Sequence, residues 1–232
     1  MSVDDADPTD AVHREDPEDL ATLLASFMTL LPVEDAAASL LGAPFDIETL
    51  VASSTRAARL DDAQIDLGEG PAWHAYRNYR PAYLHLSNAE SGETWPMFTP
   101  VAASEAVETV VSLPLLVGTS SIGAVSLFGS QQLHLDVDGL RLATGLASVL
   151  AKTIVARALE EADRGEFPRD PVLSRREVHQ ATGMVLAQTK TSAADALLLI
   201  RAYAFSAGLT VRDVAARIIA RTLDFTPDLD FD

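Results

Sequence analysis

Hydrogen-bond donors gather in the last quarter of the sequence, beside a short apolar stripe with helical spacing. The stripe consists of Val178, Ala181 and Val185, which recur at intervals of three and four residues. On a helical wheel, five donor side chains avoid this stripe: Arg175, Arg176, His179, Gln180 and Thr182. Side chains of these types contact the phosphates, sugars and exposed loop bases of RNA. The spacing therefore indicates a polyanion-binding helix face, with ordinary solvated positions as the alternative.

Gly183 lies inside the same predicted helix, where glycine costs ~1 kcal/mol relative to alanine. Close helix packing or the close approach of a ligand backbone would offset this cost, so Gly183 joins the candidate RNA-binding residues. A later helix adds Arg212 and Arg217, which point away from the apolar residues of that helix. The candidate RNA-binding set therefore spans two helices.

Three helix starts position these donors. Each is a serine or threonine followed three residues later by an acid, so that the hydroxyl caps the helix and the carboxylate favours the positive end of its dipole. The pairs are Ser174 with Glu177, Ser192 with Asp195, and Thr210 with Asp213. Apolar runs at helical spacing and short connections predict a compact three-helix module over residues 174–223.

This module resembles the ANTAR domain, the RNA-binding antiterminator module of bacterial regulators. The resemblance rests on three segments in order: VHQATGMVL at 178–186, SAADA at 192–196 and LTVRDVA at 209–215. The family usually has a lysine at the position of Thr182, so a phosphate contact by that lysine would be missing here or supplied by Arg175 and Arg176. The resemblance implies binding to stem–loops in a nascent transcript, which keeps a terminator from forming.

The charge distribution favours such a module despite a formal net charge of −17. Residues 171–223 hold 7 basic and 3 acidic residues, whereas residues 1–170 hold 10 basic and 27 acidic ones. Because the Debye length at physiological salt is only ~8 Å, polyanion binding depends on the local face. We therefore expect a basic module on an acidic carrier, with a disordered acidic tail at 1–17 and a second acidic tail at 224–232.

The preceding part of the chain alternates helical and extended patterns. We expect helices at 18–31, 55–66, a short one ending at Tyr76, and 136–164; strands at 36–41, 48–53, 81–86, 107–117 and 122–129, the last two as a hairpin; and a loop at 87–100. This order predicts an α+β fold, in which helices are layered on an antiparallel sheet.

The same order, with five short motifs, resembles the GAF domain, a small-molecule sensor fold, over residues 18–160. The motifs are LGEGP at 67–71, RP at 80–81, WP at 95–96, SLPL at 112–115 and IGAVSL at 122–127. Together the two resemblances point to GAF–ANTAR regulators of the actinobacterial type. Such proteins often have cysteine after the GEGP loop, where this chain has Ala72, so a thiol-based response at that position is excluded.

A ligand pocket is the expectation for the first domain, although neither its ligand nor a cofactor can be named. Aromatic walls with a few polar groups make typical small-molecule sites. Five aromatics fall where GAF domains place the helix and loop over their sheet: Trp73, Tyr76, Tyr83, Trp95 and Phe98. The alternative is that these aromatics are core residues.

The helix expected at 136–164 carries the pattern of a coiled-coil seam. Its apolar positions alternate four and three apart: Leu142, Leu146, Val149, Thr153 and Ala156. With the apolar helix at 18–31 beside it, this pattern favours a homodimer formed by a helical bundle. The alternative is that both helices only cover their own sheet. A charged linker with two prolines is expected at 161–173.

Several functional classes lack the residues that they need. The absence of cysteine excludes disulfides, a thiol nucleophile and thiolate metal sites. The five histidines lack metal-ligand spacing, and no P-loop, G-x-S-x-G or H-E-x-x-H motif occurs, so neither a metal site nor a catalytic site is expected. No apolar run approaches the ~18 residues of a membrane span, which indicates a cytoplasmic chain without a membrane partner.

The sequence therefore favours a signal-responsive regulator that is not an enzyme. A GAF-like domain senses a small molecule, and an ANTAR-like domain binds RNA. The alternative is a DNA-binding regulator, because residues 204–215 place a glycine turn before a capped helix, as in a helix-turn-helix. That helix offers few donors for base edges beyond Arg212 and Arg217.

Overall fold

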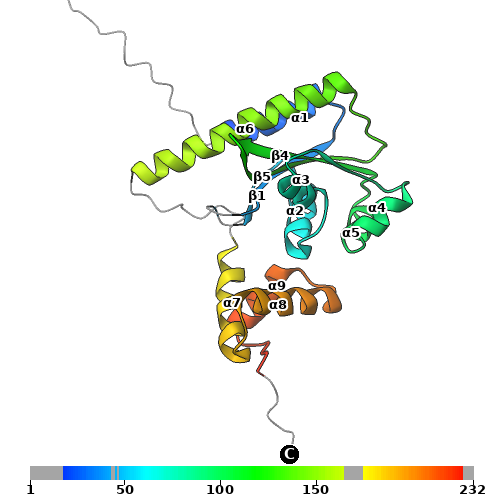
Figure 1. Ribbon diagram of the computed structural model, residues 1–232. Coiled ribbons are helices and arrows are strands. Elements are labelled where there is room, and N and C mark those ends of the chain that lie inside the picture. Colours follow the sequence, from blue (N-terminus) through cyan, green and yellow to red (C-terminus); the bar gives the residue numbers. More distant parts are fainter. Residues whose placement is uncertain (1–17, 43–44, 46, 165–174, 227–232) are drawn as a thin grey trace, which may run out of the picture.

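The computed structural model describes residues 18–42, 45, 47–164 and 175–226. Within these ranges the chain forms a sheet domain, residues 18–163, and a helical domain, residues 175–226 (Figure 1). The predicted tail at 1–17, most of the predicted linker at 161–173 and the end of the second tail lie outside the described residues. The first three linker residues continue the long helix that precedes them.

One antiparallel sheet of five strands organises the sheet domain, in the order β2-β1-β5-β4-β3. The strands are β1 Asp35–Leu40, β2 Glu48–Ala52, β3 Ala82–His85, β4 Thr109–Val117 and β5 Ser120–Gly129. The predicted hairpin is confirmed as β4–β5, with a tight turn that places Gly118 at φ +62°. Close approach of β1 requires Gly123 in β5, because a Cβ there would lie 1.9 Å from the Ser39 carbonyl oxygen.

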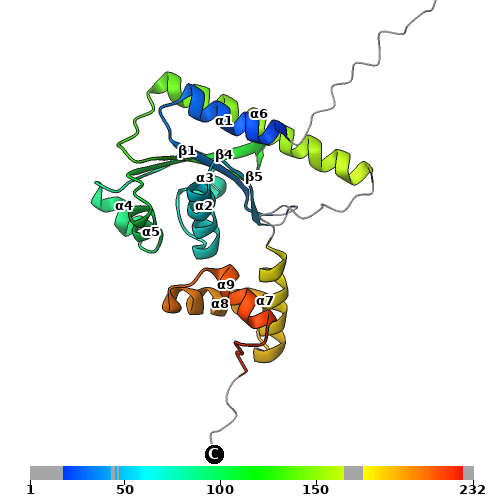
Figure 2. The same cartoon turned by 180° about the vertical axis from the view of Figure 1, so that it is seen from behind.

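Helices cover both faces of this sheet, which confirms the predicted α+β layering (Figures 1 and 2). One face carries α1, Glu18–Leu30, and α6, Val137–Asp163; the other carries α2, Thr55–Leu67, α3, Pro71–Asn78, α4, Ala89–Thr94, and α5, Phe98–Ser104. Phe27 and Leu150 lie in the core under α1 and α6, whereas Leu60 and Phe98 lie in the core on the opposite face.

The prediction of a loop at 87–100 is wrong, because α4 and the start of α5 occupy this segment. A distant side chain explains the difference. The Glu69 carboxylate accepts hydrogen bonds from the backbone N–H groups of Met97 and Phe98, at 2.7 and 2.8 Å, and thereby caps the first turn of α5. The turn formers in this stretch concealed a helix start that depends on a tertiary contact.

Helix α6 corrects the expectation that no segment is long and apolar enough to cross a bilayer. Its 27 residues include an 18-residue window that meets both conditions. Two helices near the end of the chain, α8 (Ala193–Ala207) and α9 (Val211–Ile219), meet them only as a pair that is bent by 112°. Alanine, glycine and threonine residues lie between the leucines of the α6 window, so the sequence shows no long uninterrupted run of large apolar residues there. Its buried positions face the sheet and α1: Ala143, Ala147, Leu150, Ala151 and Ile154.

The helical domain consists of α7, Arg176–Thr189, α8, Ala193–Ala207, and α9, Val211–Ile219, around a core of its own. The predicted start of α9 is confirmed as a full capping box between Thr210 and Asp213. Ser192 caps α8 by accepting from the Asp195 N–H at 3.1 Å. In the remaining predicted pair, Ser174 with Glu177, Ser174 lies outside the described residues.

Candidate functional site

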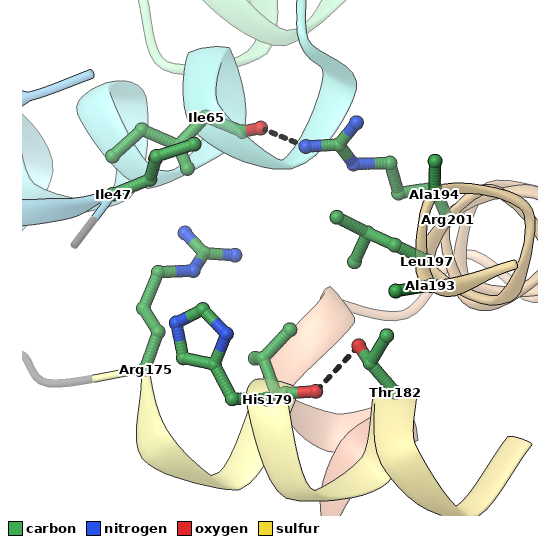
Figure 3. Close-up of a pocket in the computed structure, with 10 residues that line it drawn as sticks. Ile47, Ile65, Arg175, His179, Thr182, Ala193, Ala194, Leu197 and Arg201 are labelled. Atoms are coloured by element: carbon green, nitrogen blue, oxygen red, sulfur yellow. Dashed lines mark hydrogen bonds between the residues drawn. The ribbon is translucent and has the colours of Figure 1, made fainter. Parts of the chain in front are cut away.

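The candidate RNA-binding side chains of α7 divide into two stripes. Arg176, Gln180 and Gly183 are exposed and recur at the four- and three-residue spacing of one helix face. Arg175, with His179 and Thr182 at the same spacing, lines a cavity between the helical domain and the sheet domain, and of these three His179 is also exposed (Figure 3). The Thr182 hydroxyl donates to the Val178 carbonyl at 2.7 Å. The structure therefore does not bring all the predicted donors of α7 onto one surface.

The two candidate arginines of α9 also lie apart. Their separation of five residues corresponds to about 140° around the helix. Arg217 is exposed, whereas Arg212 lies on the flank toward α7, with its Nη1 3.5 Å from Glu177 Oε1 and its Nε 4.0 Å from Asp62 Oδ2. Arg212 therefore belongs to the seam between the domains, and Arg217 does not share that flank.

Arg175 forms the centre of that seam. Its guanidinium lies against two carboxylates of α2: Nη1 is 3.3 Å from Asp62 Oδ1, and Nη2 is ion-paired with Asp66. The side chain is only 6% exposed, and burial lowers the pKa of Arg175 to about 10, against the attraction of Asp62. The group thus stays charged at neutral pH, and its charge is matched by the sheet domain.

Two further hydrogen bonds hold the domains together at the same end of α2. Arg201 of α8 donates from Nη2 to the Ile65 carbonyl at 3.0 Å. The backbone N–H of Val211, at the start of α9, donates to Asp66 Oδ2 at 3.3 Å. All three helices of the helical domain or their caps therefore contact the last turn and a half of α2.

A buried acid lies directly beneath this docking point. Asp61 is fully buried and accepts from the hydroxyls of Thr49, at 2.7 Å, and Ser39, at 3.3 Å. Burial raises the pKa of Asp61 to about 7, and the neighbouring charge of Asp62 adds to the rise. Asp61 thus points toward the sheet, whereas Asp62, about 100° away around α2, lies between Thr49 and Arg175, with its Oδ1 3.4 Å from Thr49 Oγ1.

The five aromatic residues predicted to line a ligand pocket lie in three places. Trp73 and Tyr76 pack edge to face with ring centroids 6.0 Å apart, and the Trp73 Nε1–H donates to the Gln64 carbonyl at 2.8 Å. Trp95 and Phe98 are buried in a different core cluster, and Tyr83 is partly exposed beside His85 on β3. The structure therefore does not bring the five together as one wall, and none of them lines the interdomain cavity.

Sequence reasoning missed three residues of the seam: Asp62, Asp66 and Arg201. In the sequence, Asp62 and Asp66 look like ordinary solvated acids of a polar helix, and Arg201 interrupts an apolar run. The available signal was the opposite charge of the two parts of the chain, which indicates attraction but names no pair.

Comparisons with known proteins identify the family of the helical domain and the fold of the sheet domain. The ANTAR domain model matches residues 169–219, which contain α7, α8 and α9. Comparison of the sequence with curated proteins yields no match.

The described fold is similar to several solved domains. One is from a protein described as a two-component sensor histidine kinase of Sinorhizobium meliloti 1021, with 17% identity, a TM-score of 0.51, and coverage of 63% of this chain and 95% of that one. Two GAF domains are also similar. The domain from Geobacter sulfurreducens PCA has 18% identity and a TM-score of 0.48, with coverage of 60% of this chain and 94% of that one. The domain from the Bacillus halodurans sensor kinase has 14% identity and a TM-score of 0.47, with coverage of 62% of this chain and 97% of that one. At such identities the likeness concerns the fold.

The raised pKa of Asp61 predicts how stability depends on pH. A carboxyl group whose pKa is higher in the folded state than in the unfolded state loses stabilising protonation as pH rises, here between about 4 and 7. Asp61→Asn cannot ionise, so the stability of this variant relative to the native chain should increase from pH 5.5 to 8, by roughly 2 kcal/mol, which is about 1.4 kcal/mol for each of the ~1.5 pH units below the folded pKa.

Urea unfolding at several pH values measures this difference. Asp138→Asn is the matched control, because it removes the same charge from a side chain that is 85% exposed. A stability difference between the Asp61 variant and the native chain that stays constant with pH would contradict the prediction.

Proposed function

We propose that this chain, which joins a GAF-like domain to an ANTAR domain, is a signal-responsive regulator that binds RNA stem–loops in nascent transcripts in the cytoplasm. The match of residues 169–219 to the ANTAR domain carries the proposal, because ANTAR domains bind RNA. Both domains are of regulatory rather than catalytic types. The GAF-like domain is the sensor in this proposal, and the helical domain is the output.

The exposed stripe of α7 is the best-placed RNA contact surface in the docked arrangement. One helix face carries a cation at Arg176, an amide at Gln180 and, at Gly183, a position where no side chain covers the backbone. Apart from its chain neighbours and the backbone of α7 itself, no atom of the described residues lies within 4 Å of the position that a Cβ at Gly183 would take. Close packing within the described residues therefore does not account for this glycine, and close approach of an RNA backbone is the remaining explanation.

Gly183→Ala should stabilise the protein and weaken RNA binding. Alanine in a helix is favoured by ~1 kcal/mol over glycine, and the added methyl group meets open space in the protein alone. Binding of a stem–loop with paired six-nucleotide loops, titrated over a salt series, should weaken severalfold, and Arg176→Gln should reduce the salt slope by about one.

Gly92→Ala is the matched control for this experiment, because Gly92 lies in helix α4 and also faces open space. A duplex DNA of equal length tests the helix-turn-helix alternative. RNA affinity that is unchanged in the Gly183 variant would remove this stripe from the contact surface. Tighter binding to the duplex than to the stem–loop would favour a DNA-binding regulator instead.

The docked arrangement supports an inhibitory role for the sheet domain. Arg175 is one of the two arginines expected to contact phosphate, and it is enclosed by Asp62 and Asp66. A phosphate would have to compete with two carboxylates already in place, so RNA binding through Arg175 requires the domains to separate. The signal sensed by the GAF-like domain would act by changing how often they separate.

Asp66→Asn should therefore tighten RNA binding, because it removes a carboxylate that holds Arg175 while the amide oxygen still accepts from Val211 N–H. We expect a gain of about fivefold, the lower end of typical coupling between sites. Asp138→Asn makes the same change in net charge on α6 and serves as the control in the same titration. Equal affinities of the two variants would argue that docking does not limit RNA binding.

We also propose that the chain forms a homodimer through α6. Two positions of the predicted coiled-coil pattern, one heptad apart, are exposed: Leu142 by 39% and Val149 by 47%, whereas Leu146 between them is partly buried against the core. Leu30, at the end of α1, is exposed and lines a surface cavity together with Leu142, so exposed apolar side chains of α1 and α6 adjoin at this end of the layer. A second copy that packs its own α6 there would cover these side chains.

The double variant Leu142→Gln and Val149→Gln should dissociate such a dimer without unfolding the monomer, because both side chains are already exposed. Sedimentation equilibrium of the native and variant proteins measures this directly. Leu198→Gln, at a 62% exposed position of α8, is the control. A native protein that is monomeric at micromolar concentration would refute the proposed dimer.

A further inference from the structure

The seam between the two domains contains a partly open cavity of about 270 Å³ (Figure 3). Ile47 and Ile65 of the sheet domain form one wall, and α7 and α8 form the others. Leu197 continues the apolar lining from α8, while Arg175 and Arg201 reach into the space from α7 and α8. The cavity is thus mostly apolar, with two guanidinium groups placed by different helices.

The two arginines differ in how their charges are matched. Arg175 is paired with Asp62 and Asp66. Arg201 makes one hydrogen bond, to the Ile65 carbonyl, and its Nε is buried without a partner among the described residues. Burial lowers the pKa of Arg201, with no carboxylate in the described part of the chain opposing that effect. Arg201 is partly buried, and a cation that is withdrawn from water without a carboxylate partner among the described residues is stabilised by a nearby anion, so this site favours one additional negative charge.

We propose that the cavity binds a small organic anion, a monocarboxylate with an apolar chain of about six carbons, as an effector. Its carboxylate would accept hydrogen bonds from Arg201, and its chain would pack against Ile47, Ile65 and Leu197. A single negative charge fits because, within the described residues, Arg175 is paired with carboxylates and Arg201 is not. The apolar walls favour a carboxylate with a hydrocarbon tail over an inorganic anion such as phosphate.

The position of the cavity sets the direction of the effect. Both domains contribute walls, so the site is complete only while they are docked, and a ligand shifts the equilibrium toward the state that it binds. Docking holds Arg175 against the sheet domain, so the carboxylate weakens RNA binding. This step rests on the proposed function, whereas binding of the carboxylate does not.

Thermal unfolding and calorimetric titration of the full chain test the site, with sodium 4-methylpentanoate as the probe and neutral 4-methylpentanamide as the control ligand. The carboxylate should raise the unfolding midpoint with concentration, and the amide should not. Arg201→Gln should weaken carboxylate binding about tenfold or more, while Arg141→Gln, an exposed arginine of α6, should leave it unchanged.

Leu197→Phe provides a second variant that retains Arg201 and fills the cavity, and it should also abolish the effect of the carboxylate. Three results would overturn the proposal: no midpoint shift in the native chain, an equal shift with the amide, or an equal shift in the folded Arg201 and Leu197 variants.

A separate titration with stem–loop RNA tests the regulatory step. RNA affinity should fall severalfold at a saturating concentration of 4-methylpentanoate, and this loss should disappear in Arg201→Gln. An RNA affinity that does not respond to bound carboxylate overturns the regulatory step. Failure of the protein to bind RNA under any condition contradicts the proposed function. The shift of the unfolding midpoint would still show whether the cavity binds the carboxylate.

Discussion

The contact of Arg175 with Asp62 and Asp66 holds the helical domain against the sheet domain, and it thereby sets which side chains of α7 remain exposed. A cation that is 6% exposed requires matched carboxylates, and α2 supplies both of them within one turn. The same helix presents Asp61 and Gln64 to the sheet, where they are held by hydroxyl and backbone groups. Because α2 is anchored on its inner face, it offers the helical domain a rigid docking surface.

Much of the fold was predictable because it depends on local patterns. The β4–β5 hairpin follows from two runs of branched residues around Gly118, and the start of α9 follows from the pair Thr210 and Asp213. The start of α5 was not predictable in this way, since its cap comes from Glu69, far along the chain. Sequence periodicity reveals which residues share a face, but it does not reveal which distant side chain completes a helix end.

The candidate site was predictable in composition and not in arrangement. The residue types of α7 pointed to a polyanion, yet the helix divides them between an exposed stripe and the interdomain seam. Spacing alone does not state which flank of a helix meets another domain. The aromatic set illustrates the same limit, since Trp73 and Trp95 are close in sequence but belong to different core clusters.

The positions of the two tryptophans have a practical consequence for spectroscopy. Both lie in the sheet domain, buried on the α2–α5 face, whereas the helical domain contains Tyr203 and no tryptophan. The indole of Trp73 is hydrogen-bonded to the backbone of α2 and lies 4.8 Å from the guanidinium carbon of Arg77. Selectively excited indole emission therefore reports the sheet domain, because the helical domain has no tryptophan. The near-ultraviolet dichroism of Tyr203 and Phe225 overlaps that of both tryptophans and of Tyr76, Tyr79 and Tyr83, so it is the sheet domain that can be followed by itself in an unlabelled sample.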